Sequence, residues 1–230
     1  LIDLKKLSEL NQIEVSDNEL KIGALTCIQN IHDNELIRTE FTALHQAAHE
    51  FAGPQIRHRG TIGGNICNAS PAGDLLPALY AFRAILTIHS PAGEKTIPID
   101  EFILGPGRIR LENGALLTSI TLKRNHLQSL FQKVGLRQSM AISVVNISYA
   151  YRKNGPRFDH LMISAGAVAP TVVNLNALTT AILMSKETPL DLAGLSRVDI
   201  SPIDDIRATA KYRRMVLANL VRHFLNTTTG

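Results

Sequence analysis

The most informative stretch of this chain reads Thr61-Ile62-Gly63-Gly64-Asn65-Ile66-Cys67-Asn68-Ala69-Ser70-Pro71-Ala72-Gly73-Asp74. A glycine pair of this kind lets the backbone come close to a ligand and aim successive N–H groups at it. Short polar side chains around the pair add hydrogen-bond donors, and Asp74 adds an acceptor at the far end. This combination suits a ligand with anionic oxygens at one end and hydroxyl groups at the other, such as a diphosphate joined to a polyhydroxylated chain.

The same residues also favour a plain turn, because Gly-Gly followed by Asn-Ala-Ser-Pro is typical of turns without a ligand. It is not a P-loop, since no Gly-Lys-Ser/Thr follows the glycines, and it is not the GxGxxG turn of a Rossmann unit. From the glycines alone, a turn and a phosphate-binding loop both remain open.

The composition excludes several classes of protein. The chain has 230 residues and a net charge of +4, and its basic residues are scattered, so a nucleic-acid-binding stripe is not indicated. Two cysteines are too few for an iron–sulfur cluster, which takes four thiolates, or for a disulfide framework. They favour a reducing compartment, and we expect a cytoplasmic protein.

No uninterrupted apolar stretch is long enough to span a bilayer, and no signal peptide opens the chain. The chain begins at Leu1 and not at Met, which is typical of a fragment, a processed product or one part of a larger polypeptide.

The apolar periodicity predicts an α+β fold. Helical spacing predicts a helix over 34–51 with Asp33 as its N-cap, and a second helix that begins after Asp74. The residues between them, 56–68, are expected to be extended. Strands are predicted over 1–7, 20–25, 84–89, 96–99 and 116–122, with a polar connection over 11–18.

A polar break at 125–128 is the predicted boundary between a domain over 1–125 and a second over 126–230. The second domain is predicted to be a small antiparallel sheet of three strands with helices, and Asn154-Gly155 is a strong hairpin signal within it. Its strands are predicted over 131–134, 143–152 and 160–168, and its helices over 175–184, 191–196 and 204–225.

The run from Gly53 to Asp74 resembles the second FAD-binding loop of the flavin subunits of molybdenum hydroxylases, the family of xanthine dehydrogenase and carbon monoxide dehydrogenase. Three downstream segments are similar to further family motifs, in family order: Phe-Ile-Leu-Gly-Pro-Gly-Arg at 102–108, Phe-Gln-Lys-Val-Gly-Leu-Arg at 131–137, and 202–214. The matches run from Leu1 to the C-terminus. The chain is most similar to the bacterial xanthine dehydrogenase type, which has its flavin on a separate subunit.

The resemblance implies the second half of a vanillyl-alcohol-oxidase/PCMH-type FAD-binding domain, followed by a CO dehydrogenase flavoprotein-type C-terminal domain. In this family the FAD site has two walls, and the segment 61–65 matches one of them. The other wall is a segment similar to Gly-Gly-Thr-Asp that lies upstream of the part matching Leu1, so we expect the N-terminal FAD subdomain to be missing. The residues that match the family's cofactor contacts are Thr61, Ile62, Gly63, Gly64 and Asn65 at the diphosphate, Asn68 near the flavin end, Asp74 at cofactor hydroxyls, Leu117 at the isoalloxazine ring and Lys133 at the flavin's polar edge.

Several of these residues have simpler interpretations. Asp74 is a plausible helix N-cap, Leu117 an ordinary core leucine and Lys133 a solvated surface lysine. His45 and His49 stand at i and i+4, a spacing that can hold a metal on one helix face, but a third ligand is not evident and we expect no metal site. Arg57 is expected to anchor the loop and not to touch the cofactor.

The function that the resemblance implies is electron transfer through FAD. Substrate would be oxidised at a molybdenum cofactor on a large partner subunit, and electrons would pass through [2Fe–2S] clusters on a small partner subunit to FAD, then to NAD⁺ or another acceptor. No catalytic acid or base is expected from this chain, because the redox chemistry belongs to the cofactor. The alternative is a truncated, cofactor-free remnant that acts as a scaffold or docking partner; a self-contained oxidase is a third, less favoured interpretation.

Overall fold

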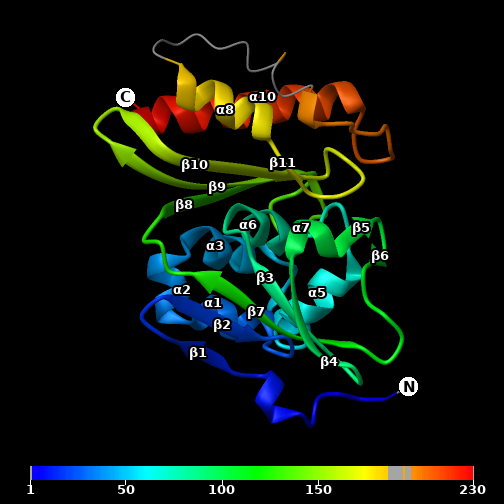
Figure 1. The fold of residues 1–230 in the computed structure, drawn as a ribbon. Helices are drawn as coiled ribbons and strands as arrows, with labels where there is room; N and C mark the ends of the chain where they lie inside the picture. The colour runs from blue at the N-terminus through cyan, green and yellow to red at the C-terminus, as the bar shows by residue number, and fades with distance from the viewer. Residues whose placement is uncertain (1, 186–193, 195–197, 230) are drawn as a thin grey trace.

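The computed structural model describes residues 2–185, 194 and 198–229. Figure 1 shows two sheets, with the helices α3 and α6 between them and the helices α8 and α10 over the outer face of the second sheet. The first sheet and its helices come from the first half of the chain, and the second sheet begins after the chain leaves β7 (Leu116–Lys123).

The first sheet has five antiparallel strands in the order β1-β2-β7-β3-β4. Its strands are β1 (Ile13–Val15), β2 (Glu19–Gly23), β3 (Ile85–Ser90), β4 (Gly93–Pro98) and β7. The hairpin between β3 and β4 closes at the pair Ser90 and Gly93, where glycine adopts a φ of 115° that other residues avoid. A short 3₁₀ helix, η1 (Ser8–Leu10), precedes β1. Between β4 and β7 lie the helix α7 (Ile99–Phe102) and a two-stranded ribbon of β5 (Ile103–Gly105) and β6 (Arg108–Ile109).

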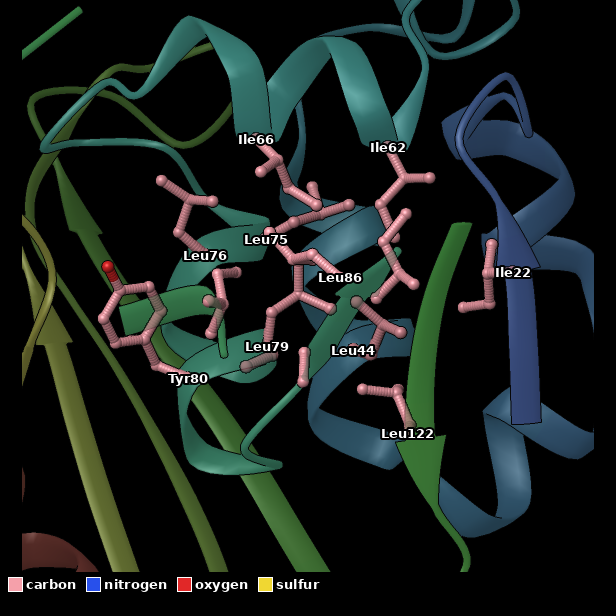
Figure 2. Close-up of a cluster of buried hydrophobic side chains, with 14 of the residues drawn as sticks. Ile22, Leu44, Ile62, Ile66, Leu75, Leu76, Leu79, Tyr80, Leu86 and Leu122 are labelled. Atoms are coloured by element: carbon pink, nitrogen blue, oxygen red, sulfur yellow. The ribbon is translucent and has the colours of Figure 1, made fainter. Parts of the chain in front are cut away.

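Six short helices connect β2 to β3: α1 (Ile28–Asp33), α2 (Glu35–Glu40), α3 (Thr42–Glu50), α4 (Pro54–Arg57), α5 (Ile62–Asn68) and α6 (Leu75–Ala81). All of them except α4, which has no buried residue, bury apolar side chains in one core with the first sheet. Figure 2 shows Ile62 and Ile66 of α5 pointing into the same cluster as Leu75 of α6 and Leu86 of β3. All four side chains are fully buried, and each contributes about 1.5–3 kcal/mol through removal of apolar surface from water.

The second sheet has the order β11-β10-β9-β8, with β8 (Gln128–Gly135), β9 (Ser143–Asn154), β10 (Arg157–Gly166) and β11 (Val173–Asn174). The predicted hairpin forms, since Asn154 pairs with Arg157 across a turn in which Gly155 has a φ of 63°. The three predicted strands are present, and the two-residue β11 extends the sheet at one edge. So short a strand shows no alternating pattern in the sequence.

The helices α8 (Asn176–Met184) and α10 (Ala210–Thr229) cover the outer face of this sheet, while α3 and α6 pack on its inner face. The first two thirds of β9, from Ser143 to Ala150, are therefore buried on both sides. The ring of Phe224 of α10 stacks on Tyr149 of β9 at a centroid distance of 3.9 Å, which ties the last helix to the sheet.

Several predicted elements are wrong in detail. Residues 2–7 form no strand, and the first strand, β1, lies at the sheet edge within the stretch expected to be a connection. The helix predicted over 34–51 is divided at Phe41, whose ring is buried and whose φ of −122° and ψ of 49° are not helical. Asn34, not Asp33, caps α2, because its side chain accepts the N–H of Ile37 at 3.0 Å.

The last helix begins at Ala210, not at Asp204, because Asp205 folds the preceding residues into a turn. Its carboxylate accepts the backbone N–H groups of Arg207 and Ala208 at 2.8 and 3.1 Å. The helix predicted over 191–196 lies outside the described residues, Gly194 excepted.

Candidate functional site

The glycine-rich segment is helical and not extended as predicted. Residues 62–68 form α5, and Thr61 is its N-cap, because the Thr61 hydroxyl oxygen accepts the N–H of Gly64 at 3.0 Å. Two glycines and seven residues make a poor isolated helix. Burial of Ile62 and Ile66 in the core supplies the stability that the local sequence lacks.

The first backbone N–H groups of α5 are bonded within the chain. Ile62 donates to the carbonyl of Thr26 at 3.0 Å, Gly63 to that of Ala24 at 2.9 Å, and Asn65 to that of Thr61 at 2.9 Å. The expectation that successive N–H groups of this segment point at a ligand is corrected by these bonds. The N–H groups of Ile62 and Gly63 hold α5 against the residues that follow β2.

The two glycines have different surroundings. A Cβ on Gly63 would lie 2.7 Å from both the carbonyl oxygen and the Cβ of Ala24, so glycine is required there for packing. A Cβ on Gly64 would meet only the Thr61 hydroxyl, at 3.0 Å, and Gly64 is exposed. The open backbone face of the segment is therefore at Gly64.

Two asparagines flank the open face. Asn68 is exposed at the last position of α5. Asn65 has a buried side-chain oxygen, Oδ1, without a hydrogen-bond partner among the residues that the structure describes. A buried acceptor in this state is costly unless something donates to it, and a ligand hydroxyl is a suitable donor.

Ala24 links this segment to the central strand of the first sheet. Its N–H donates to the carbonyl of Thr118 in β7 at 2.9 Å, while its own carbonyl accepts from Gly63. The neighbouring Leu117 is 8 % exposed and belongs to the first core. Its packing is that of a core leucine, and contact with a flavin ring stays a prediction.

The structure brings Asp74 and Lys133 together. The ammonium Nζ of Lys133 lies 2.6 Å from Oδ2 of Asp74, and the two side chains are 6 % and 9 % exposed. Lys133 Nζ also donates to the carbonyl of Glu50, at the end of α3, at 3.1 Å. Of the two simpler interpretations, the one for Lys133 is wrong, since Lys133 is not a solvated surface lysine. Asp74 does stand at the N-cap position of α6, but its side chain makes no capping bond there.

Two residues that the sequence did not single out complete this cluster. Ser143 Oγ donates to Oδ1 of Asp74 at 2.7 Å, and Asn146 Nδ2 donates to the same oxygen at 3.2 Å. Both belong to the doubly covered part of β9 and are fully buried. Polar residues in an otherwise apolar strand, Ser-Val-Val-Asn-Ile-Ser-Tyr-Ala, were the signal that could have indicated them, because buried polar groups need partners.

Arg57, in the segment before α5, is anchored to α1 and to the end of α3, and its predicted role at the loop stays a prediction. Its Nε donates to the side-chain oxygen of Gln29 at 3.0 Å and its Nη1 to the carbonyl of His49 at 2.9 Å. His32 stacks between His45 and His49, with ring centroids 4.9 and 5.4 Å away. Among the described residues no group of three or more histidine, cysteine or acidic side chains is arranged to hold a metal ion.

Burial raises the pKa of the Cys67 thiol to about 11, so this side chain behaves as a small hydrophobe on the inner side of α5. In the part of the chain that the structure describes, no helix combines the length and apolar character needed to cross a bilayer.

Comparison with known proteins identifies the fold and its family. Residues 1–122 match the model of the FAD binding domain in molybdopterin dehydrogenase, and residues 130–228 match that of the CO dehydrogenase flavoprotein C-terminal domain. The chain belongs to this family of molybdenum hydroxylase FAD subunits, which confirms the predicted family and fold class.

Individual relatives agree with this assignment. The chain is 31% identical over 217 residues to the xanthine dehydrogenase FAD-binding subunit of Escherichia coli O157:H7, covering 93% of this chain and 73% of the relative. It is 38% identical over 150 residues to the nicotinate dehydrogenase FAD-subunit of Eubacterium barkeri, and the match covers 63% of this chain and 51% of the relative. A solved structure of carbon monoxide dehydrogenase from Hydrogenophaga pseudoflava superimposes with a TM-score of 0.92 at 27% identity, covering 99% of this chain and 81% of that one.

Proposed function

We propose that this chain is the FAD-binding electron-transfer subunit of a molybdenum hydroxylase of the xanthine dehydrogenase type. The observation that carries the proposal is the buried pair of Asp74 and Lys133, two residues that were expected at the cofactor and that meet within one cluster. The family assignment supplies the identity of the cofactor.

The pair has unused hydrogen-bonding capacity. A carboxylate offers about four acceptor positions, and Asp74 uses three of them, for Lys133, Ser143 and Asn146. An ammonium group has about three N–H donors, and Lys133 uses two of them, for Asp74 and Glu50. Asp74 can therefore accept a bond from a cofactor hydroxyl, and Lys133 can donate to a cofactor oxygen or nitrogen.

The remaining proposed contacts lie on α5 and β7. The exposed backbone face of Gly64 and the unpartnered oxygen of Asn65 suit the close approach of a diphosphate and its neighbouring hydroxyls. Thr61, Ile62 and Gly63 shape the helix that presents these two residues. Asn68 is proposed to act nearer the flavin end, and Leu117 against the ring.

FAD, when bound, would supply the redox chemistry, and the residues of this chain supply position and electrostatics. A lone lysine cation near the flavin would stabilise negative charge on it and raise its potential. Here Asp74 compensates the charge of Lys133, so the effect on the flavin depends on which end of the ion pair faces it.

The proposed partners follow from the family. Electrons would arrive from [2Fe–2S] clusters on a small subunit, which receive them from a molybdenum cofactor on a large subunit, and would leave to NAD⁺ or another acceptor. We propose a cytoplasmic protein with two structural domains, 1–125 and 126–230; the two family models meet between 122 and 130, which supports this division.

The test is the visible absorption spectrum of the purified chain after incubation with FAD and desalting, compared with an Asp74→Asn variant. A retained flavin spectrum that is weakened in the folded fraction of the variant supports the proposal. A folded protein that retains no flavin would contradict cofactor binding by this polypeptide and favour the scaffold or docking role. NADH is then added in the absence of oxygen to test NAD⁺ as the electron acceptor. Loss of the flavin absorbance would indicate that electrons pass between NADH and the flavin.

A further inference from the structure

Ser143 and Asn146 occupy a part of the fold in which polar side chains are costly. Residues 143–150 of β9 lie between α6 on one side and the outer helices on the other, and every one of them is buried. A buried hydroxyl or amide destabilises a protein unless it is hydrogen-bonded. Ser143 Oγ and Asn146 Nδ2 both meet this need by donating to one carboxylate, that of Asp74, while Asn146 Oδ1 has no partner among the described residues.

The bonds divide the two oxygens of Asp74 between different partners. Oδ1 accepts from the two neutral side chains of β9, and Oδ2 faces the ammonium of Lys133. With Oδ1 fixed by donors from a rigid strand, the carboxylate has a defined rotation. The direction of the Asp74–Lys133 pair is thereby set from the second sheet.

Asn146 also holds the backbone that carries Asp74. Its Nδ2 donates to the carbonyl of Gly73 at 3.3 Å as well as to Asp74. The space for its amide exists because its neighbour across the sheet is Gly166, on which a Cβ would lie 2.2 Å from Asn146 Oδ1. The next residue, Ala167, donates to the carbonyl of Pro71 at 2.7 Å, so β10 holds the same turn.

From this arrangement we infer that Ser143 and Asn146 are positioning residues for the cofactor site: they orient the Asp74 carboxylate, and through it Lys133, toward bound FAD. This inference rests on the proposed function. The two residues do not touch the cofactor; they act through Asp74. Their contribution is an orientation that the turn at 70–74 does not provide by itself, since the Asp74 side chain makes no capping bond to α6.

The experiment compares Ser143→Ala and Asn146→Asp with Ser148→Ala. Ser148 is also fully buried on β9, and its hydroxyl has no partner among the described residues, so its loss leaves Asp74 untouched. Ser143→Ala removes one donor, and Asn146→Asp replaces two N–H groups by a second carboxylate beside Asp74. Two measurements are made on each protein.

The first measurement is FAD affinity, by flavin fluorescence titration, together with the midpoint potential of the bound flavin. We expect Ser143→Ala to weaken FAD binding about tenfold and Asn146→Asp more, both with a shifted potential, because a charge-assisted hydrogen bond is lost. Ser148→Ala should match the wild type in affinity and potential.

The second measurement needs no FAD. The rate at which acetic anhydride acylates Lys133, followed by mass spectrometry, reports how firmly Asp74 holds the ammonium. We expect faster acylation in Ser143→Ala than in Ser148→Ala, because Asp74 then holds the ammonium less firmly. In Asn146→Asp we expect a rate that differs from the wild type, because the added carboxylate displaces Asp74 and itself attracts the ammonium. Wild-type affinity, potential and acylation rate in folded Ser143→Ala and Asn146→Asp would overturn the inference, and so would equal changes in Ser148→Ala.

Failure of the proposed function looks different. A folded wild-type chain that binds no FAD overturns the cofactor role of all these residues, whatever the acylation rates. A wild type that binds FAD, with variants that lose only thermal stability, leaves the proposed function standing and refutes positioning.

Discussion

Lys133 Nζ lies 2.6 Å from Oδ2 of Asp74, although 59 residues separate the two in the chain. Asp74 stands at the turn before α6, in the part of the chain that matches the FAD binding domain model, and Lys133 stands on β8, in the part that matches the C-terminal domain model. The pair therefore joins the two halves of the chain at the place where the cofactor is proposed to bind.

Removal of one partner of this pair should be strongly destabilising. Asp74→Asn keeps the shape of the side chain but leaves the Lys133 ammonium buried without a counter-charge, which typically costs about 3–5 kcal/mol. Urea unfolding measures the loss. The double variant Asp74→Asn/Lys133→Met should recover part of it, because no charge is then left buried.

The matched control for this prediction is Glu35→Gln. Glu35 forms an ion pair with Arg38 at 2.6 Å, but its side chain is 71% exposed, so water can replace the partner. The free energy of unfolding should hardly change. Equal effects of Asp74→Asn and Glu35→Gln would show that burial of the first pair has no energetic consequence.

Substitutions at Gly63 and Gly64 should separate the packing role of the first glycine from the ligand-binding role proposed for the second. Gly63→Ala places a Cβ 2.7 Å from the backbone of Ala24, and overpacking of this kind costs about 1–3 kcal/mol. Gly64→Ala meets only the Thr61 hydroxyl and gains helix propensity, so its stability should stay within about 1 kcal/mol of the wild type. Thermal unfolding of both variants checks the difference.

FAD affinity, unlike stability, should respond to the substitution at Gly64. If the exposed face of Gly64 receives the diphosphate, Gly64→Ala weakens FAD binding in a protein of normal stability. A Gly64→Ala variant with wild-type affinity would place the diphosphate elsewhere.

Asp205 should make the stability of the C-terminal part depend on acid pH. Burial disfavours its charged form, but bonds from Arg207, Ala208 and Arg213 outweigh burial and lower the pKa of Asp205 from 3.8 to about 2. A carboxylate with a lowered pKa stabilises the fold above its unfolded pKa, and this contribution is lost as the pH falls through the folded value.

The measurement is urea unfolding of the wild type and Asp205→Asn at several pH values. At pH 5 the wild type should be more stable by about 2 kcal/mol. The difference should shrink between about pH 4 and pH 2, where the carboxylate of the wild type becomes protonated. A difference that stays constant over this interval would show that the charge of Asp205 is not its cause.

Cys67 should be a slow nucleophile in the folded protein. Burial raises the pKa of its thiol from 9.0 to about 11, which lowers the thiolate fraction near neutral pH about 100-fold. In a Cys27→Ser protein, alkylation of Cys67 by iodoacetamide at pH 8 should accelerate about 100-fold when urea unfolds the chain. Comparable rates in the folded and unfolded protein would mean that α5 opens readily.

The segment 61–74 shows how far local sequence goes. Its glycines, asparagines and aspartate predicted a cofactor-binding segment and, with three further motifs, the family that the comparisons confirm. Its helical state was not predictable, because two glycines disfavour a helix and much of its stability comes from the burial of Ile62 and Ile66 in the first core. Phe41 is the reverse case: helical periodicity ran through it, and tertiary packing divided the helix there.

The sequence alone therefore determined the family, the α+β class and the hairpin at Asn154-Gly155, since these depend on residue types at fixed spacings along the chain. Through the family resemblance it also predicted the candidate cofactor residues. Only the tertiary structure decided that Asp74 meets Lys133, and that Ser143 and Asn146 hold it. Those contacts depend on how β8 and β9 pack against α3 and α6, over sequence separations that no local pattern encodes.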